Sequence, residues 1–76
     1  MKPILPQPDD LLVRDYPNNL RMIVRDWAGA PTAILVSHDG TKLWDAIQHE
    51  TQGLEGAIEC GERNALYLSS LPESDR

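Results

Sequence analysis

The sequence contains no phenylalanine and a single cysteine, Cys60. One cysteine excludes an intramolecular disulfide and any four-cysteine zinc site. Small secreted domains normally depend on disulfides, so this cysteine count indicates a reducing compartment, and we expect a cytoplasmic protein. The first ten residues lack the apolar stretch of a signal peptide. No apolar run approaches the about 20 residues that a membrane-spanning helix needs, so we expect a soluble chain with no membrane partner.

Motifs that bind phosphates are also missing. The chain has no P-loop and no glycine-rich dinucleotide pattern. Its glycines at positions 53, 56 and 61 lie among glutamates, which would repel a phosphate. Basic residues are few, with seven Lys and Arg against twelve Asp and Glu, and the net charge is −5. Because phosphate contacts need Lys and Arg, we expect no direct binding of nucleic acid.

The negative charge is concentrated in one part of the chain. The segment from position 39 to position 62 contains one basic residue, Lys42, and six acidic residues: Asp39, Asp45, Glu50, Glu55, Glu59 and Glu62. Acidic and basic residues balance in the rest of the chain. Complementary charge speeds the encounter with a partner and selects among partners. This distribution predicts docking on a basic surface, and the alternative is a solvated helix face without a binding role.

Chain length limits the size of the core. A chain of 76 residues forms one domain at most. Folding a chain this short buries only about 60% of its unfolded surface, so the core is thin. A deep active-site cleft would remove side chains that this core needs. We therefore expect a protein that is not an enzyme, with no catalytic residues and no cofactor.

Candidate metal ligands and nucleophiles are scattered. The residues that could hold a metal are His38, Asp39, His49, Glu50 and Cys60, and no pair among them has the short, regular spacing of a zinc motif. A cysteine can act as a nucleophile beside a histidine, but nothing in the local sequence brings such a pair together. We expect no metal site, and we interpret Cys60 as a small buried side chain.

Alternation of apolar residues predicts two strands. In residues 20–27, Leu20, Met22 and Val24 lie on one face, which we expect to meet the core. Residues 32–38 include three consecutive aliphatic residues, a pattern typical of a buried strand. The short loop between the two segments predicts an antiparallel hairpin.

The rest of the domain is predicted as one helix and a third strand. Apolar residues recur at helical spacing from position 43, so we expect an amphipathic helix over residues 41–52. Gly53 and Gly56 would end it, because each costs about 1 kcal/mol inside a helix, and residues 53–61 would form a further helical turn or an irregular loop. Residues 62–71 alternate in polarity and are predicted as a strand, with a helix as the alternative. The expected fold is α+β, a small antiparallel sheet of about three strands with one amphipathic helix packed on it, in the order β-β-α-β.

Proline shapes the N-terminal region. Three prolines within MKPILPQPDD favour extended backbone, so we expect a Pro-rich arm. Residues 11–16 are predicted as a helical turn or a short edge strand, ended by a turn at Pro17. The expected organisation is an arm with a short turn element over residues 1–19, a single α+β domain over 20–71 and a polar tail over 72–76.

Two tryptophans complete the set of candidate binding residues. Tryptophan is enriched at binding hot spots, although Trp27 and Trp44 could equally fill the core of a chain without phenylalanine. Trp27 shares a strand face with Arg21 and Arg25, so we expect it to be the more exposed of the two. The partner-binding candidates are therefore Trp27, Trp44 and the six acidic residues of the segment.

We interpret the sequence as that of a small acidic protein-binding module. Such a module would act as an adaptor or inhibitor that docks on a basic surface of a larger protein, for example a nucleic-acid-handling enzyme. Small regulators from phages and mobile elements act in this way, and the comparison with them rests on size and charge alone. The alternative is a structural or assembly subunit that is stable as a homo-oligomer or within a complex, because a thin core and open sheet edges favour association.

Overall fold

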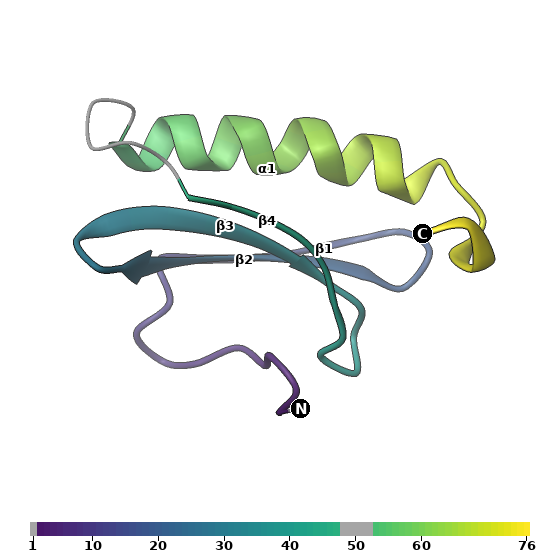
Figure 1. Ribbon diagram of the computed structural model, residues 1–76, viewed down its shortest axis with the longest axis horizontal. Coiled ribbons are helices and arrows are strands. Elements are labelled where there is room, and N and C mark those ends of the chain that lie inside the picture. Colours follow the sequence, from purple (N-terminus) through teal and green to yellow (C-terminus); the bar gives the residue numbers. More distant parts are fainter. Residues whose placement is uncertain (1, 48–52) are drawn as a thin grey trace.

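The computed structural model describes residues 2–47 and 53–76. These residues form four strands, β1 (Leu12–Tyr16), β2 (Leu20–Trp27), β3 (Ala30–Val36) and β4 (Lys42–Ile47), then a helix, α1 (Gly53–Ser69), and a short 3-10 helix, η1 (Glu73–Asp75). The strands make one sheet in the order β1-β2-β3-β4, and each neighbouring pair is antiparallel. Helix α1 lies across one face of the sheet, and the N-terminal segment, residues 2–11, lies on the other side (Figure 1). The fold is therefore α+β, as predicted.

The predicted hairpin of β2 and β3 is confirmed. Two residues, Ala28 and Gly29, connect the strands, and both have positive φ, 55° and 87°. Two-residue turns of this kind match the right-handed twist of antiparallel strands. Strand β3 therefore begins at Ala30, opposite Trp27 and two residues before the predicted start. Strand β1, for which the sequence allowed a helical turn or an edge strand, is an edge strand paired with β2.

The predicted helix over residues 41–52 is wrong in the part that the structure describes, because Lys42–Ile47 forms β4. An apolar pattern this short suits a strand as well as a helix, and pairing with β3 decides between them. A register shift between Leu35 and Val36 interrupts the pairing, and the adjacent residues Leu43 and Trp44 both pack against the same core. The rest of the predicted helix, residues 48–52, lies outside the described residues. The sheet thus has four strands rather than about three.

Helix α1 covers residues 53–61, for which a further helical turn or a loop was expected, and continues into residues 62–71, for which a strand was favoured over a helix. The observed order is therefore β-β-β-β-α rather than β-β-α-β. Ala57, Gly61 and Ala65 recur every four residues and are all buried against the sheet. A Cβ at Gly61 would meet Met22 Sδ and would lie 3.0 Å from Ala33 Cβ. Small residues thus bring α1 close to the sheet, and this packing outweighs the about 1 kcal/mol that each glycine costs in a helix.

Both faces of the sheet bury side chains, in two unequal layers. The layer under α1 contains the β2 residues that alternation predicts, and its buried members are Leu20, Met22, Val24, Ala33, Leu35, Ala57 and Ala65. The layer on the opposite face is smaller and consists of Ile23, Ile34 and Val36, with Ile4 packed against it. Ile23 is therefore buried on the β2 face that also carries Arg21 and Arg25, whereas Trp27 on that face is 61% exposed.

A backbone hydrogen bond and an ion pair hold the N-terminal segment to the sheet. The Ile4 N–H donates to Gly40 O at 2.9 Å. Arg25 donates from Nε and Nη2 to the Asp10 carboxylate at 2.8 and 3.1 Å. The Asp10 side chain is only 2% exposed, so this pair is shielded from water. The fit is close at Gly40 (φ 96°), where a Cβ would lie 2.5 Å from Pro3 Cβ, so this position requires glycine.

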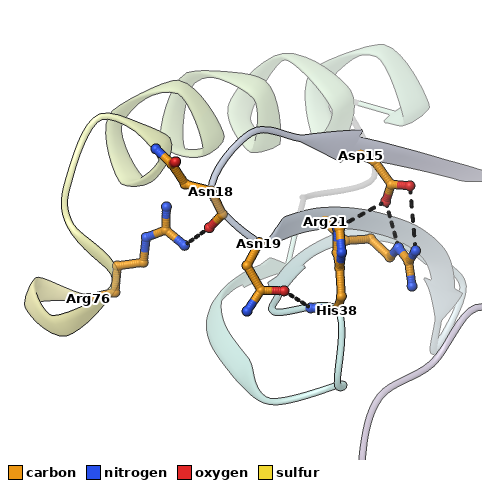
Figure 2. A network of polar contacts seen from close by, with 6 residues as sticks. All are labelled: Asp15, Asn18, Asn19, Arg21, His38 and Arg76. Carbon is orange, nitrogen blue, oxygen red and sulfur yellow. Dashed lines mark hydrogen bonds and ion pairs between the residues drawn. The ribbon is translucent and has the colours of Figure 1, made fainter.

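The end of α1 is attached to the turn between β1 and β2. Arg76 donates from Nε to Leu68 O at 2.9 Å and from Nη1 to Asn18 O at 2.5 Å (Figure 2). Asn18 Nδ2 donates to Ser69 O at 2.5 Å. The bonds to Leu68 O and Ser69 O satisfy carbonyl groups that a helix C-terminus leaves without partners. Arg76 is therefore attached both to the end of α1 and to the β1–β2 turn.

Candidate protein-interaction surfaces

The candidate residues divide between the two faces of the sheet. Trp27 and Asp45 line one pocket on the face that carries the N-terminal segment. Glu55, Glu59 and Glu62 belong to α1, which covers the opposite face. The structure therefore brings together two subsets of the candidates and places the sheet between them.

Two further candidates, Asp39 and Trp44, join neither subset. Asp39 lies in the β3–β4 turn, where its carboxylate accepts hydrogen bonds from the Ser37 hydroxyl and from the Thr41 N–H, the latter at 3.0 Å. These bonds, chiefly the one from Ser37, hold the pKa of Asp39 below its usual value. Trp44 is half-buried against the core under α1. Glu50 lies outside the described residues.

Two of the acidic candidates are engaged in ion pairs. Asp45 Oδ2 lies 2.8 Å from Lys42 Nζ. Glu62 pairs with Arg14 of β1 and so links α1 to the edge of the sheet. Glu55 and Glu59 are both exposed, and neither has an ion-pair partner among the residues that the structure describes. These two carboxylates are therefore the ones in position to meet a positively charged partner.

The solvent-facing side of α1 also carries large apolar residues, about two turns beyond Glu59 along the helix. Leu66 and Tyr67 are each 64% exposed. At 100° per residue, Leu66 falls within about 20° of Glu55 and Glu59, and Tyr67 lies about 80° beyond Glu59. We call Glu55, Glu59, Leu66 and Tyr67 the outer face of α1. Sequence reasoning missed Leu66 and Tyr67 as binding candidates, because the alternating polarity of residues 62–71 predicts a strand. Read as a helix, the same residues place Leu66 and Tyr67 on the side of Glu59.

A shallow pocket of about 290 Å³ opens on the opposite face of the sheet. We call it the Trp27 pocket, and its lining residues are Ile4, Trp27, Thr32, Ile34, Lys42 and Asp45. Ile34 and Thr32 are 8% and 5% exposed and form its base, whereas Trp27 stands exposed at its side. Strand register explains the arrangement, because Ile34 pairs with Asp45 across β3 and β4. The pocket combines an aromatic wall, an apolar floor and a charged rim.

A polar cluster joins β1, β2 and the β3–β4 turn. Arg21 Nε lies 2.6 Å from Asp15 Oδ1, and His38 Nε2 lies 3.7 Å from the same oxygen (Figure 2). The backbone N–H of His38 donates to Asn19 Oδ1 at 3.0 Å. The hydrogen bond from Arg21 lowers the pKa of Asp15 and keeps this carboxylate charged. The contacts of this cluster fix the β1–β2 turn and the β3–β4 turn relative to each other.

Cys60 is half-buried on α1 rather than fully buried, and Asn64 Nδ2 donates to its carbonyl oxygen at 2.9 Å. Within residues 2–47 and 53–76, no group of three or more His, Cys, Asp or Glu side chains could hold a metal ion. The helices of this described part include none that is long and apolar enough to cross a membrane. No protein-family model, curated protein or solved structure matches this chain.

Proposed function

We propose that this protein is a small protein-binding module, an adaptor or inhibitor, that docks the outer face of α1 on a basic surface of a larger protein. One observation carries the proposal: Leu66 and Tyr67 are each 64% exposed on the same side of α1 as the exposed side chains of Glu55 and Glu59. Exposed apolar residues that gather on one face, with polar residues around them, are typical of interaction sites.

Binding would bury the apolar pair and leave the carboxylates at the rim. Tyrosine is enriched at hot spots, and burying a leucine side chain stabilises a complex by about 1.5–3 kcal/mol. Glu55 and Glu59 would mainly speed association with a positively charged surface, an effect that salt weakens. Arg63 lies between Glu59 and Tyr67 around the helix, so the partner's positive charge is expected to meet the Glu55 end of the face.

The proposal uses fewer acidic residues than the charge pattern indicates. Glu62 pairs with Arg14, so its reversal would also break a contact between α1 and β1. Asp39 stabilises the β3–β4 turn through its own hydrogen bonds. A charge-reversal test is therefore best confined to Glu55 and Glu59.

Two variants test the outer face. Glu55→Lys/Glu59→Lys reverses its charge, and Leu66→Ser/Tyr67→Ser removes its apolar part. Both changes lie at exposed positions, so we expect the free energy of unfolding in urea to change by no more than about 0.5 kcal/mol per substitution. Immobilised wild-type protein and variants would be exposed to a lysate of the source organism, and retained proteins would be quantified by mass spectrometry. We expect both variants to retain the partner about tenfold less, which corresponds to about 1.4 kcal/mol.

The matched control is Asp9→Lys/Glu73→Lys, which makes the same change in charge at exposed positions outside the outer face. We expect it to retain the partner as the wild type does. Equal retention by all three variants would refute docking through α1. Loss of the partner in the control as well would show that net charge alone, rather than this face, attracts it.

A homo-oligomeric assembly subunit is the second candidate, since β1 is an open edge of the sheet. Edge strands invite pairing with another chain unless charges or short length prevent it. β1 has only five residues, and the Arg14 and Asp15 side chains on it are 42% and 56% exposed. These features disfavour pairing at the β1 edge. A solution mass of 8.5 kDa at micromolar concentration would support the docking module, and a stable multiple of it would support the subunit.

A further inference from the structure

We propose that the Trp27 pocket binds an arginine side chain of a partner protein. This inference goes beyond the proposed function, because the pocket lies on the opposite face of the sheet from α1 and would recognise a single side chain rather than a surface. A module that uses both faces could hold two partners at once.

The pocket is built from three strands and the N-terminal segment. Its base is formed by Ile34 and Thr32 on β3, and Asp45 on β4 lies directly opposite Ile34. Trp27 closes the end towards β2, and Ile4 closes the side of the N-terminal segment. Its volume of about 290 Å³ lies at the lower limit of small-molecule sites, so it suits one long side chain rather than a cofactor.

The chemistry of the lining favours a cation with an apolar stem. An indole face attracts cations, and among side chains a guanidinium stacks on it best because it is planar and weakly hydrated. A guanidinium can also donate two parallel hydrogen bonds to a carboxylate such as that of Asp45. The methylene groups of the same side chain would lie against Ile4 and Ile34. A carboxylate or phosphate ligand would instead face the negative charge of Asp45.

Lys42 shows that the rim already attracts a cation. Its Nζ lies 2.8 Å from Asp45 Oδ2, and the two side chains are 49% and 48% exposed. Exposed pairs of this kind contribute little to stability, so a ligand can replace the lysine at small cost. Lys42 also has room to move, because a neighbouring hollow adjoins it, lined by Lys2, Pro3, Ile4, Gly40, Thr41 and Lys42. We infer that Lys42 occupies the carboxylate until a guanidinium displaces it.

The test uses the full chain labelled with ¹⁵N and N-acetyl-arginine amide as the probe, followed by NMR. The Trp27 indole N–H signal is identified by its absence in Trp27→Phe. We expect this signal and the amide signals of Ile34 and Asp45 to shift saturably with the arginine probe. The citrulline analogue has the same shape without the charge, and we expect it to bind at least about fivefold more weakly than the arginine probe. We expect the lysine analogue to bind at least about twofold more weakly than the arginine probe.

Three variants separate the roles of the lining residues. Trp27→Ala and Asp45→Asn are each expected to weaken binding of the arginine probe about fivefold. Lys42→Ala is expected to strengthen it about twofold, because the competing cation is gone. Glu55→Lys/Glu59→Lys, on the other face, should bind the probe as the wild type does. Normal probe binding by this last variant, together with its loss of the protein partner, would show that the two sites are independent.

Several results would overturn the assignment. Equal shifts with the arginine and citrulline probes would show that charge plays no part. Weaker binding of the arginine probe in Lys42→Ala would show that Lys42 does not compete for the Asp45 carboxylate, and a stronger response to N-acetyl-glutamate amide would point to an anion site. Free L-arginine is expected to bind no more tightly than the blocked probe, and much tighter binding would point to the free amino acid rather than a protein side chain.

Discussion

Tyr16 packs against the core under α1, but its hydroxyl oxygen is buried without a hydrogen-bond partner among the described residues. A buried polar atom without a partner costs about 1–3 kcal/mol. We expect Tyr16→Phe to raise the free energy of unfolding in urea by about 1 kcal/mol, because the ring stays and the unpaired hydroxyl is removed. Tyr67→Phe is the matched control at an exposed position and should change stability by less than about 0.5 kcal/mol. A less stable Tyr16→Phe would show that the hydroxyl has a partner in solution.

The exposure of single residues could be predicted where strand alternation decides it. Trp27 shares a β2 face with two arginines, and it is the more exposed of the two tryptophans. Ile23 lies on the same face but is buried, because Ile4, 19 residues away in the chain, covers it. No periodic pattern contains such a contact. The pairing of Glu62 with Arg14 is hidden from the sequence for the same reason, since it joins a helix to a distant strand.

Strands β2 and β3 could be predicted because their own side chains carry a clear signal. Strand β4 could not, because its bulged register breaks strict alternation and its apolar residues recur at helical spacing from position 43. Helix α1 was hidden by the nature of its buried face, where Ala57, Gly61 and Ala65 add little hydrophobicity. Their spacing of four residues places them on one face of a helix. That face identifies a helix only when it is seen packed closely against the sheet.

The small residues of α1 lead to a prediction about the helix as a whole. In an isolated helix, Gly61→Ala would stabilise by about 1 kcal/mol. Here the new Cβ would meet Met22 Sδ and approach Ala33 Cβ, and overpacking of this kind costs about 1–3 kcal/mol. We expect a net loss of about 1–2 kcal/mol in urea unfolding, with α1 pushed away from the sheet.

Gly56→Ala is the matched control for this helix, because Gly56 is only half-buried. It is expected to be neutral or stabilising by up to about 1 kcal/mol. If both alanine variants were equally stabilising, close packing at Gly61 would not limit the distance between helix and sheet.

At the scale of the whole molecule, the sheet is covered by a 17-residue helix on one face and by the short N-terminal segment on the other. Asp10→Ala would leave Arg25, whose side chain is 20% exposed, without its shielded partner. We expect the free energy of unfolding in urea to fall by about 2–3 kcal/mol. Hydrogen exchange at the Ile4 amide should also become faster, because its bond to Gly40 depends on the position of the segment. Asp9→Ala, a change at an exposed neighbouring position, is the control and should leave both measurements unchanged. If Asp10→Ala also left both measurements unchanged, contacts other than the Asp10–Arg25 pair would hold the segment.

Ile4 has two roles at once, since it covers Ile23, Ile34 and Val36 and also forms one wall of the Trp27 pocket. Whenever the segment lifts, aliphatic side chains become accessible and the pocket loses a wall. An occupant of the pocket would contact the lifted state less well, and by mass action it would favour the closed one. Occupancy of the Trp27 pocket should therefore increase the resistance of the protein to self-association. The reason is that Ile4 both lines the pocket and covers the aliphatic side chains.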